Sequence, residues 1–228
     1  IKLGNERVVE ARLSDAEFFW IKDKSQNMVK KVTDLKSMNY FRGLGSYFDK
    51  AQRMRKLGGM ISDELFISKE KVELSASICK VDLLSEIVGE FPELQGIIGG
   101  YYARASGEIT AVSNAITGHY RPQGPADNLP TTPTAMVVAL ADKVDTLVGF
   151  FGIDAKPTGS KDPFALRRSA LGVIRIILNG QVNLPLTTFL QAAAKGYGFA
   201  AVDGDLLPFI RDRLRGYLRD QQMRHDVV

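Results

Sequence analysis

The sequence predicts an all-α fold, and two patterns carry that prediction. Apolar residues recur at the spacing of an amphipathic helix in several stretches, for example at Tyr47, Phe48, Ala51, Met54 and Leu57. The stretch from Pro133 to Phe151 is apolar on almost every side, which is typical of a helix buried at the centre of a fold. Only Asp142, Lys143 and Asp145 bring charge into it.

The first 25 residues predict the end of a preceding domain and a connecting helix. Residues 1–12 alternate apolar and polar side chains, which favours a short extended segment. Ser14 and Glu17 match a capping box, so a helix is expected to start there and to carry the aromatic residues at 18–20. We expect these rings to be packed rather than stacked on nucleic-acid bases, because aromatic side chains are usually buried.

Three helices are expected between residues 26 and 91. The stretch 26–57 predicts two helices broken between residues 39 and 45, and the glycine pair at 58–59 is expected to end the second. Ser68 is expected to cap a longer helix that ends before Pro92, since the residue before a proline disfavours the helical conformation. Pro92 itself suits the first turn of the following helix.

Two short helices are expected next. The first is expected to bury Leu94, Ile97, Ile98 and Tyr101. The second is expected to bury Ile109, Val112, Ile116 and Tyr120. His119 lies at the end of this second stripe, where a hydrogen-bonded ring is the expected role and a metal or phosphate contact is the alternative. The other histidine, His225, belongs to no pattern.

The last part of the chain predicts a loop, the buried helix and three further helices. Residues 121–133 hold four of the nine prolines, which favours a loop. Thr132 as N-cap and Pro133 at the first helical position predict where the buried helix starts. Asp162 is expected to cap the next helix and Pro163 to begin it, with two amphipathic helices after it. The helix that begins at Pro163 is expected to turn Phe164, Leu171, Ile174 and Leu178 toward the core.

The composition is that of a soluble, mildly basic protein. The 228 residues are 45% hydrophobic, which suffices for a core, and the net charge is +4. No apolar run reaches the ~18–20 residues of a membrane span. The single cysteine, Cys79, excludes an internal disulfide and is expected to be buried and unreactive. We expect a cytoplasmic protein that makes no membrane contact.

Two aspartates are candidates to meet inside the core. Asp82, Glu86 and Glu90 recur every four residues, so they are expected to share one helix face, where like charges repel. Asp142 belongs to the buried helix, and a buried carboxylate must be paired, hydrogen-bonded or metal-bound. We therefore expect Asp82 and Asp142 to lie close together.

Several long motifs in fixed order carry a family resemblance. They are GNERVVEARLSDAEFFW, LGSYFDKAQRM, KVDLLSEIVGEFPELQG, GHYRP, LADKVDTLVGFFG and KPTGSKDPFALRR. Together they resemble the β subunit of the bacterial-type, two-subunit (α2β2) glycyl-tRNA synthetase over essentially the whole chain. Because the chain starts at Ile1 and that subunit is much larger, an internal fragment is expected.

The resemblance implies a degenerate HD-type domain, a helical fold related to metal-dependent phosphohydrolases. It is expected at 26–152, after a connecting segment at 1–25 and before a helical extension into the subunit body at 153–228. An active HD site uses a first His, an adjacent His-Asp pair and a distal Asp as metal ligands.

Only two of these four ligands are expected here. Val81 stands at the His of the pair beside Asp82, the first His position lies near Arg42, and Asp142 matches the distal Asp. Without imidazoles the resemblance implies no metal and no hydrolase activity. We expect a cation, Arg42 or Lys50, to have replaced the metal.

The resemblance also implies a supporting role in glycyl-tRNA formation. The chain would help the remainder of the β subunit to hold tRNA-Gly and to dock against the α subunit, with no catalytic residue and no cofactor of its own. ATP and Mg would be used through the α subunit. In agreement, the sequence contains no Walker loop and no dinucleotide fingerprint.

Basic residues predict where RNA could bind. The candidate contacts are Lys50, Arg53, Lys161, Arg167, Arg168 and Arg175. Residues 159–161 also precede a helix N-terminus, which suits an anion such as an RNA phosphate. Two alternatives stay open. One is a purely structural scaffold whose basic faces are solvated, and the other is an HD phosphohydrolase with imidazole ligands from unexpected positions.

Overall fold

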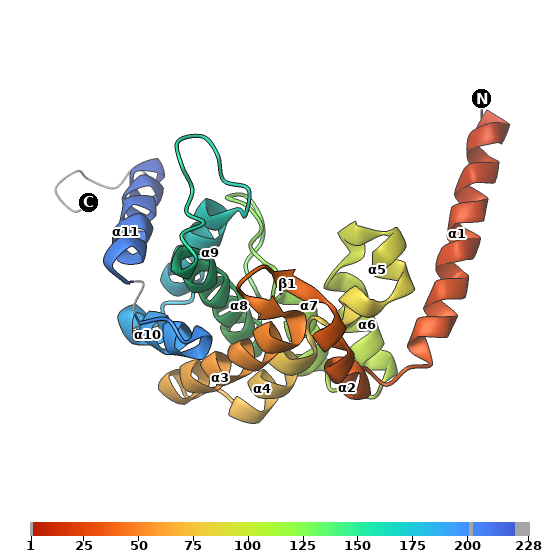
Figure 1. The fold of residues 1–228 in the computed structure, drawn as a ribbon. Coiled ribbons are helices and arrows are strands. Elements are labelled where there is room, and N and C mark those ends of the chain that lie inside the picture. The colour runs from red at the N-terminus through yellow and green to blue at the C-terminus, as the bar shows by residue number, and fades with distance from the viewer. Residues whose placement is uncertain (1, 201–202, 222–228) are drawn as a thin grey trace.

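The computed structural model describes residues 2–200 and 203–221. Figure 1 shows a stack of helices with α9–α11 at one end and α1 at the opposite end. Within the described residues there are eleven α-helices and one very short β-hairpin, so the all-α prediction is confirmed. In the same ranges, no helix combines the length and the apolar composition that crossing a membrane requires. His225 and the stretch 222–228 lie outside the described residues.

Helix α1 (Lys2–Lys24) contradicts the predicted extended start. The capping-box residue Ser14 lies inside this helix and does not begin it. Glu, Arg, Ala and Leu dominate this stretch, and their helix propensity outweighs a short alternation of apolar and polar residues. Ring packing is mixed, because Trp20 stacks on Tyr102 with centroids 5.2 Å apart whereas Phe18 is exposed.

The predicted break after residue 38 is a β-hairpin. Helix α2 (Met28–Lys31) and a 3-10 helix η1 (Val32–Ser37) lead into strands β1 (Asn39–Phe41) and β2 (Gly45–Ser46), which pair antiparallel. Helix α3 (Tyr47–Leu65) follows directly, and Ser46 and Asp49 form its capping box.

The glycine pair at 58–59 does not end a helix, as predicted, but lies buried inside α3. A Cβ atom at Gly58 would lie 2.9 Å from Val72 Cγ1 of the next helix, α4 (Lys69–Ile78). The glycine therefore allows α3 and α4 to approach closely, a packing reason for glycine that local sequence does not reveal.

The expected long helix after Ser68 is three separate elements. Helix α4 ends at Ile78, the 3-10 helix η2 (Val81–Leu84) carries Asp82, and α5 (Glu86–Glu90) begins a new direction. Ser85 caps α5, since its Oγ accepts from the Val88 backbone N–H at 3.1 Å. The three carboxylates therefore do not share one helix face.

The next elements bury fewer residues than predicted. They are η3 (Pro92–Leu94), which has Pro92 in its first turn, α6 (Ile97–Ala105) and α7 (Thr110–Gly118). Val112 and Ile116 are buried as expected. Ile97, Tyr101 and Ile109 are instead 43%, 55% and 52% exposed. The spacing of apolar residues predicted that these three side chains are buried, but in the structure they lie at the surface.

Helix α8 (Pro133–Gly152) is the central element, as predicted. Thr132 caps it, with its Oγ1 accepting from the Ala135 backbone N–H at 3.3 Å, and Pro133 is its first residue. Helices α3, α4, α7, α9 and α10 all contact it. Its buried face, including Leu140, Val144 and Leu147, joins residues from α3 to α11 in one hydrophobic cluster.

Helices α9 (Leu166–Asn179), α10 (Leu186–Tyr197) and α11 (Asp203–Asp220) pack at the end of the fold away from α1. Helix α9 begins at Leu166 and not at Pro163, and Leu178 is exposed. Because buried residues of all three helices belong to the same core as α8, no separate core marks the predicted boundary at residue 153, which stays a prediction.

Candidate functional site: a buried lysine–aspartate cluster and a basic groove

Opposite charges meet inside the protein where α3, the end of α4 and α8 come together. Lys50 projects from α3, Lys80 lies between α4 and η2, and Asp142 lies on α8. The Nζ atoms of Lys50 and Lys80 each lie 3.1 Å from the same Asp142 Oδ1. Both lysines are only 2% exposed, so the carboxylate and not water balances their charge.

Asp145 and Arg53 extend these contacts by one helical turn. Lys50 Nζ donates to Asp145 Oδ2 at 3.2 Å and to Thr146 Oγ1 at 2.9 Å. Arg53 Nε donates to Asp145 Oδ1 at 2.8 Å, and the Tyr197 hydroxyl donates to Asp145 Oδ2 at 2.8 Å. Through this carboxylate, α10 is tied to α3 and α8. The lysine–aspartate cluster is defined as Lys50, Arg53, Lys80, Asp142 and Asp145.

Mutual neutralisation sets the ionisation of the cluster. Burial alone would lower the pKa of Lys50, but Asp142 and Asp145 outweigh it and hold that pKa well above its ordinary value. Burial alone would raise the pKa of Asp142, but Lys50 and Lys80 hold it well below its ordinary value. Both groups are therefore ionised at neutral pH, and neither is poised to give or take a proton.

The cluster does not have the chemistry of a metal site. Two ammonium groups face Asp142, and an ammonium has no lone pair to offer a metal. Across the described ranges, no three His, Cys, Asp or Glu side chains are grouped as metal ligands would be. What the cluster can do is fix the relative position of three helices.

The ligand positions predicted at Val81 and Asp82 lie in η2, directly after Lys80. Val81 and Asp82 are buried in η2, and Asp82 Oδ2 accepts from the Gly96 backbone N–H at 2.6 Å. Burial raises the pKa of Asp82 to about 6. No ion pair within the described residues includes Asp82, so Asp82 and Asp142 share no cation by direct contact. Arg42 is exposed in the turn between β1 and β2, so of the two cations expected at Asp142 only Lys50 contacts it, together with Lys80.

Cys79 and His119 lie close to the cluster without taking part in it. Burial raises the pKa of the Cys79 thiol to about 12, which makes it unreactive at neutral pH, as predicted. His119 is buried at the end of α7, and its Nδ1 lies 2.5 Å from the Ile116 carbonyl oxygen. Burial lowers the pKa of His119 well below its ordinary value, so the ring is neutral and hydrogen-bonded.

A basic groove of about 400 Å³ lies between α9 and α11. Four guanidinium groups line it, from Arg167, Arg168, Arg213 and Arg219, against the two carboxylates of Asp212 and Asp220. Arg213 pairs with Asp212, whereas Arg168 and Arg219 are exposed to solvent. The α9–α11 groove therefore offers guanidinium groups that suit phosphate oxygens.

Of the predicted RNA contacts, two are held by ion pairs and two are partly engaged. Lys50 and Arg53 belong to the lysine–aspartate cluster, so neither offers a free cation at the surface. Arg175 donates to the carbonyl oxygens of Gly124 and Asp127 at 2.8 and 2.9 Å and thereby holds the 121–131 loop against α9.

Arg167 Nη2 donates to the Gly159 carbonyl oxygen at 2.6 Å while its side chain still lines the α9–α11 groove. Lys161 and Arg168 are exposed and form no ion pair with another described residue. Of the predicted contacts, these two basic groups are therefore the least constrained.

The predicted anion site at the start of α9 is occupied by the chain itself. Asp162 Oδ1 accepts from the Leu166 backbone N–H at 2.8 Å, and Asp162 Oδ2 accepts from the Arg167 backbone N–H at 3.0 Å. This carboxylate satisfies the N–H groups that a phosphate would use. Ala165 and not Asp162 is the N-cap, but the Asp162 carboxylate covers the first N–H groups of the helix, so the loop at 159–161 presents no free helix end.

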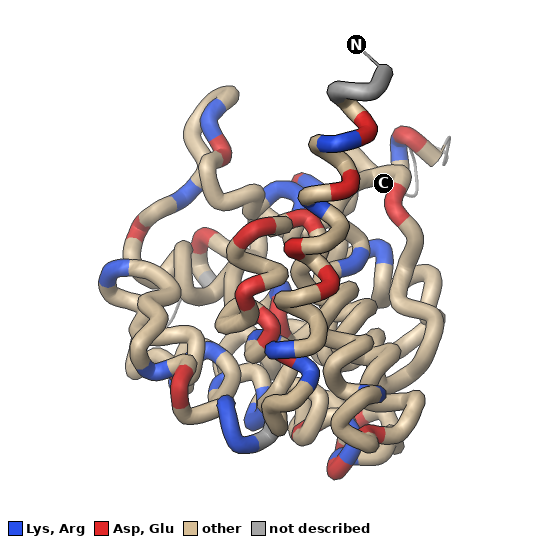
Figure 2. The backbone as a smooth tube through the Cα atoms, turned by 90° about the vertical axis from the view of Figure 1, so that its right-hand side faces the viewer, with Lys and Arg blue, Asp and Glu red and all other residues tan. Residues whose placement is uncertain are grey.

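Charge is distributed differently on the face that carries α1. Figure 2 shows acidic residues gathered in the centre of this face. Ion pairs from Lys22 to Glu86 and from Arg12 to Glu90 join α1 to α5. Two acidic side chains of this face are therefore used to hold α1 against α5.

Comparison with known proteins assigns the chain to a family. A family described as the glycyl-tRNA synthetase beta subunit matches residues 1–228. The chain belongs to this family. The sequence motifs resembled those of the glycyl-tRNA synthetase β subunit, and this resemblance is therefore confirmed.

Curated relatives named glycine–tRNA ligase beta subunit cover the whole chain. The protein of Rhodospirillum centenum is 47% identical over 99% of this chain and 32% of its own length. That of Phenylobacterium zucineum is 48% identical over 100% of this chain and 33% of its own length. That of Ruegeria sp. is 46% identical over 100% of this chain and 33% of its own length. The chain thus spans about a third of the length of these β subunits.

Sequence reasoning on this β-subunit chain missed three residues of the candidate site. Lys80 directly precedes Val81 in the same motif, and Asp145 lies three residues after Asp142 on the helix predicted to be buried. A lysine on a stretch predicted to be buried was the available signal for Lys80. Tyr197 lies in an otherwise ordinary amphipathic helix, and nothing local connects it to Asp145.

Proposed function

We propose that this chain is the part of a glycine–tRNA ligase β subunit that supports tRNA-Gly binding and docking to the α subunit. Family membership over all 228 residues is the observation that carries the ligase role. In this proposal the remainder of the β subunit completes the RNA surface. The α subunit uses ATP and Mg to form glycyl-tRNA, and this chain supplies no catalytic group.

The α9–α11 groove is the proposed RNA-contacting surface. Arg168 and Arg219 are exposed there, and arginine pairs well with phosphate oxygens because its planar fork donates two parallel hydrogen bonds. Lys161 is exposed at the loop before α9 and adds a further positive charge. Lys50 and Arg53 are excluded from this surface because both are paired with carboxylates, Lys50 in the core and Arg53 at a partly buried position.

The lysine–aspartate cluster is proposed as the remnant of an HD metal centre. Lys50 and Lys80 would stand at the two imidazole positions, and Val81 at the carboxylate of the His-Asp pair. This placement moves the pair by one residue from the one expected from the sequence. Its support is that Lys80, and not Val81 or Asp82, reaches Asp142. A salt-bridged core in place of a metal leaves no nucleophile for phosphoester hydrolysis.

The test is binding of the chain to a tRNA-Gly transcript over a salt series, with an unrelated tRNA beside it. Arg168→Gln and Arg219→Gln should each weaken binding and lower the salt slope by about 1, because each removes a phosphate contact. The matched control is Arg55→Gln, which removes an exposed guanidinium of α3 that pairs with Glu73. If the groove variants bind tRNA as tightly as the Arg55→Gln control does, the proposed surface is refuted.

A purely structural scaffold is the second candidate, because Arg175 and Arg167 are used to hold backbone carbonyl groups. This candidate predicts that the wild-type chain binds no tRNA even at low salt. It also predicts that groove substitutions change neither tRNA binding nor assembly with the α subunit.

A further inference from the structure

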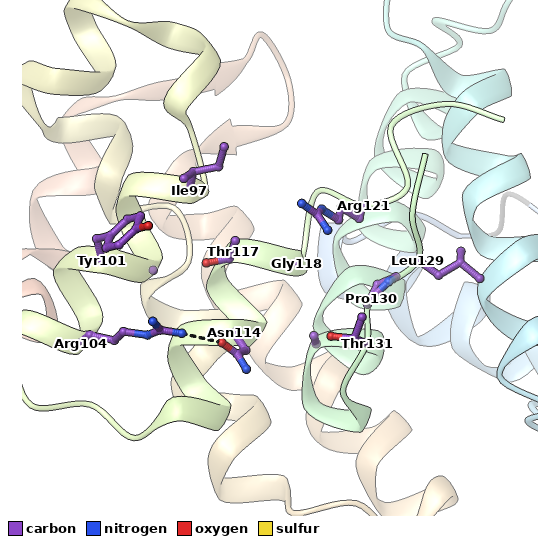
Figure 3. A pocket seen from close by; sticks show the side chains of 12 residues that line it. Ile97, Tyr101, Arg104, Asn114, Thr117, Gly118, Arg121, Leu129, Pro130 and Thr131 are labelled. Atoms are coloured by element: carbon purple, nitrogen blue, oxygen red, sulfur yellow. Dashed lines mark hydrogen bonds between the residues drawn. The ribbon is translucent and has the colours of Figure 1, made fainter. Parts of the chain in front are cut away.

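A second pocket lies between α6, α7 and the segment 129–131, separate from both the lysine–aspartate cluster and the α9–α11 groove (Figure 3). Its cavity of about 270 Å³ is slightly smaller than the ~300 Å³ at which the usual range of ligand pockets begins. It has room for one nucleotide-sized group but not for a base pair.

The pocket is rich in hydrogen-bond donors and carries positive charge. Its lining includes Arg104 and Arg121 and no aspartate or glutamate. Arg104 is already engaged, since its Nε donates to Ser113 Oγ at 3.1 Å and its Nη2 to Asn114 Oδ1 at 3.0 Å. An amine or a metal cation would find no counter-charge here, whereas an anion would find two guanidinium groups.

Arg121 is the free cation of the pocket. Figure 3 shows its side chain reaching from the loop side toward α6 and α7. No hydrogen bond or ion pair to another described residue engages its guanidinium. A half-buried guanidinium with an unused planar fork is suited to one phosphate group.

Tyr101 gives the pocket an aromatic surface. Its side chain is 55% exposed at the rim of the pocket. Trp20 packs edge-on against it, with centroids 6.4 Å apart and ring planes at 88°, and Trp20 is in turn stacked on Tyr102. The ring is therefore held in place by aromatic neighbours while much of it remains open. An exposed ring near an arginine is how proteins bind unpaired nucleotides.

Asn114 adds a group that can read a base edge. Its Oδ1 accepts from Arg104, which leaves the Nδ2 atom to donate to a carbonyl or ring nitrogen of a base. Thr131 lies on the opposite wall and contributes a hydroxyl group. Aromatic, amide and guanidinium groups thus surround a space of single-nucleotide size.

We propose that this pocket binds one unpaired nucleotide of an RNA, with the base against Tyr101 and a phosphate at Arg121. The inference rests on the proposed RNA-binding function but uses a different surface. Duplex RNA does not fit, because a paired base cannot enter the cavity.

The test uses fluorescence anisotropy with a six-nucleotide single-stranded RNA and a blunt-ended, two-strand RNA duplex, which has no unpaired nucleotide. Tyr101→Ala and Arg121→Gln should weaken binding of the single strand about fivefold or more, the effect of losing one stacked base or one phosphate contact. Binding of the duplex should not change. Tyr101→Phe keeps the ring and should bind as the wild type does. Arg55→Gln is the matched control for loss of a surface guanidinium.

The outcomes separate this inference from the proposed function. If tRNA binding depends on Arg168 but the single strand binds equally well to the Tyr101 and Arg121 variants, the pocket inference is wrong and the groove stands. If tRNA does not bind but the single strand binds in a Tyr101-dependent way, the groove proposal fails and the pocket stands. Free AMP or UMP that binds as tightly as the RNA, with the same losses in the variants, would overturn the RNA assignment in favour of a free nucleotide. Equal melting temperatures of all variants exclude loss of folding as the cause.

Discussion

Asp82 is a buried residue whose ionisation should respond to pH just below neutrality. Its pKa in the folded protein is about 6, above the ordinary value of 3.8, because the carboxyl is buried. The folded state therefore binds the proton more tightly than the unfolded state. The resulting stability is fully present below about pH 4 and is lost as the pH rises through about 6. The difference between the two pKa values corresponds to roughly 3 kcal/mol.

Asp82→Asn should flatten the pH dependence of stability between about pH 4 and 7. The asparagine keeps an oxygen that can accept from the Gly96 N–H, but it has no charge to bury. The free energy of unfolding, measured in urea at several pH values, should therefore fall less steeply for the variant as the pH rises. Asp34→Asn, at an exposed position, should keep the wild-type dependence. Parallel curves for Asp82→Asn and the wild type would contradict the assignment.

At the scale of elements, the missing side chain of Gly58 allows α3 to pack closely on α4. Gly58 lies in the interior of α3, where alanine is normally about 1 kcal/mol more favourable. Here an added Cβ would lie 2.9 Å from Val72 Cγ1, which is buried and cannot swing away into solvent. Packing and helix propensity therefore oppose each other at this position.

Gly58→Ala should lower the free energy of unfolding by about 1–3 kcal/mol, because overpacking outweighs the gain in propensity. Gly216→Ala is the matched control, since Gly216 lies inside α11 and a Cβ added there would meet no atom within 4 Å. The control should raise stability by up to about 1 kcal/mol. Urea unfolding of both variants measures the contrast, and a stabilised Gly58→Ala protein would show that the two helices can move apart without cost.

The elements that could be predicted from the sequence are those with local signals. Thr132 and Pro133 set the start of α8, and its apolar surface on all sides set its central place. The start of α1 and the separation of α4 from α5 could not be predicted, because helix-compatible residues continue across both points. What decides there is tertiary packing, such as the turn that buries Asp82 and Lys80.

At the scale of the whole molecule, three elements distant in sequence meet at one carboxylate oxygen. Asp142 Oδ1 receives Lys50 from α3 and Lys80 from the end of α4. A histidine is shorter than a lysine, and a metal bound to its ring nitrogen lies about 2.0–2.1 Å beyond it. A metal held by two histidines would therefore lie near the present positions of the ammonium groups.

The double variant Lys50→His with Lys80→His should create a zinc site with Asp142. Two imidazoles and a carboxylate are a common ligand set for divalent metals. Zinc should raise the melting temperature of this variant, because metal binds the folded state only, and it should leave the wild type unchanged. Lys50→Met with Lys80→Met removes the same charges without adding ligands and is the control. A variant that folds but shows no zinc-dependent shift would contradict the proposed HD remnant.

The candidate site could be predicted only in part. A buried charge on α8 that needed a partner was visible in the sequence, and Lys50 was one of the two cations expected to meet it. The second cation, Lys80, was missed because Val81 and Asp82 beside it matched the HD pattern more directly. The α9–α11 groove brings together residues more than forty positions apart, which no local pattern encodes.

The lysine–aspartate cluster has a consequence for how this protein comes apart. If α4 alone detached, Lys80 would leave with it, and Asp142 would keep only one of its two cations in a region closed to water. If α8 detached, two ammonium groups would remain facing each other without a counter-charge. Breaking a buried pair in this way costs about 3–5 kcal/mol. Partly open forms therefore have a high free energy and are rarely populated. We expect α3, α4 and α8 to lose their protection against hydrogen exchange together, as one cooperative unit.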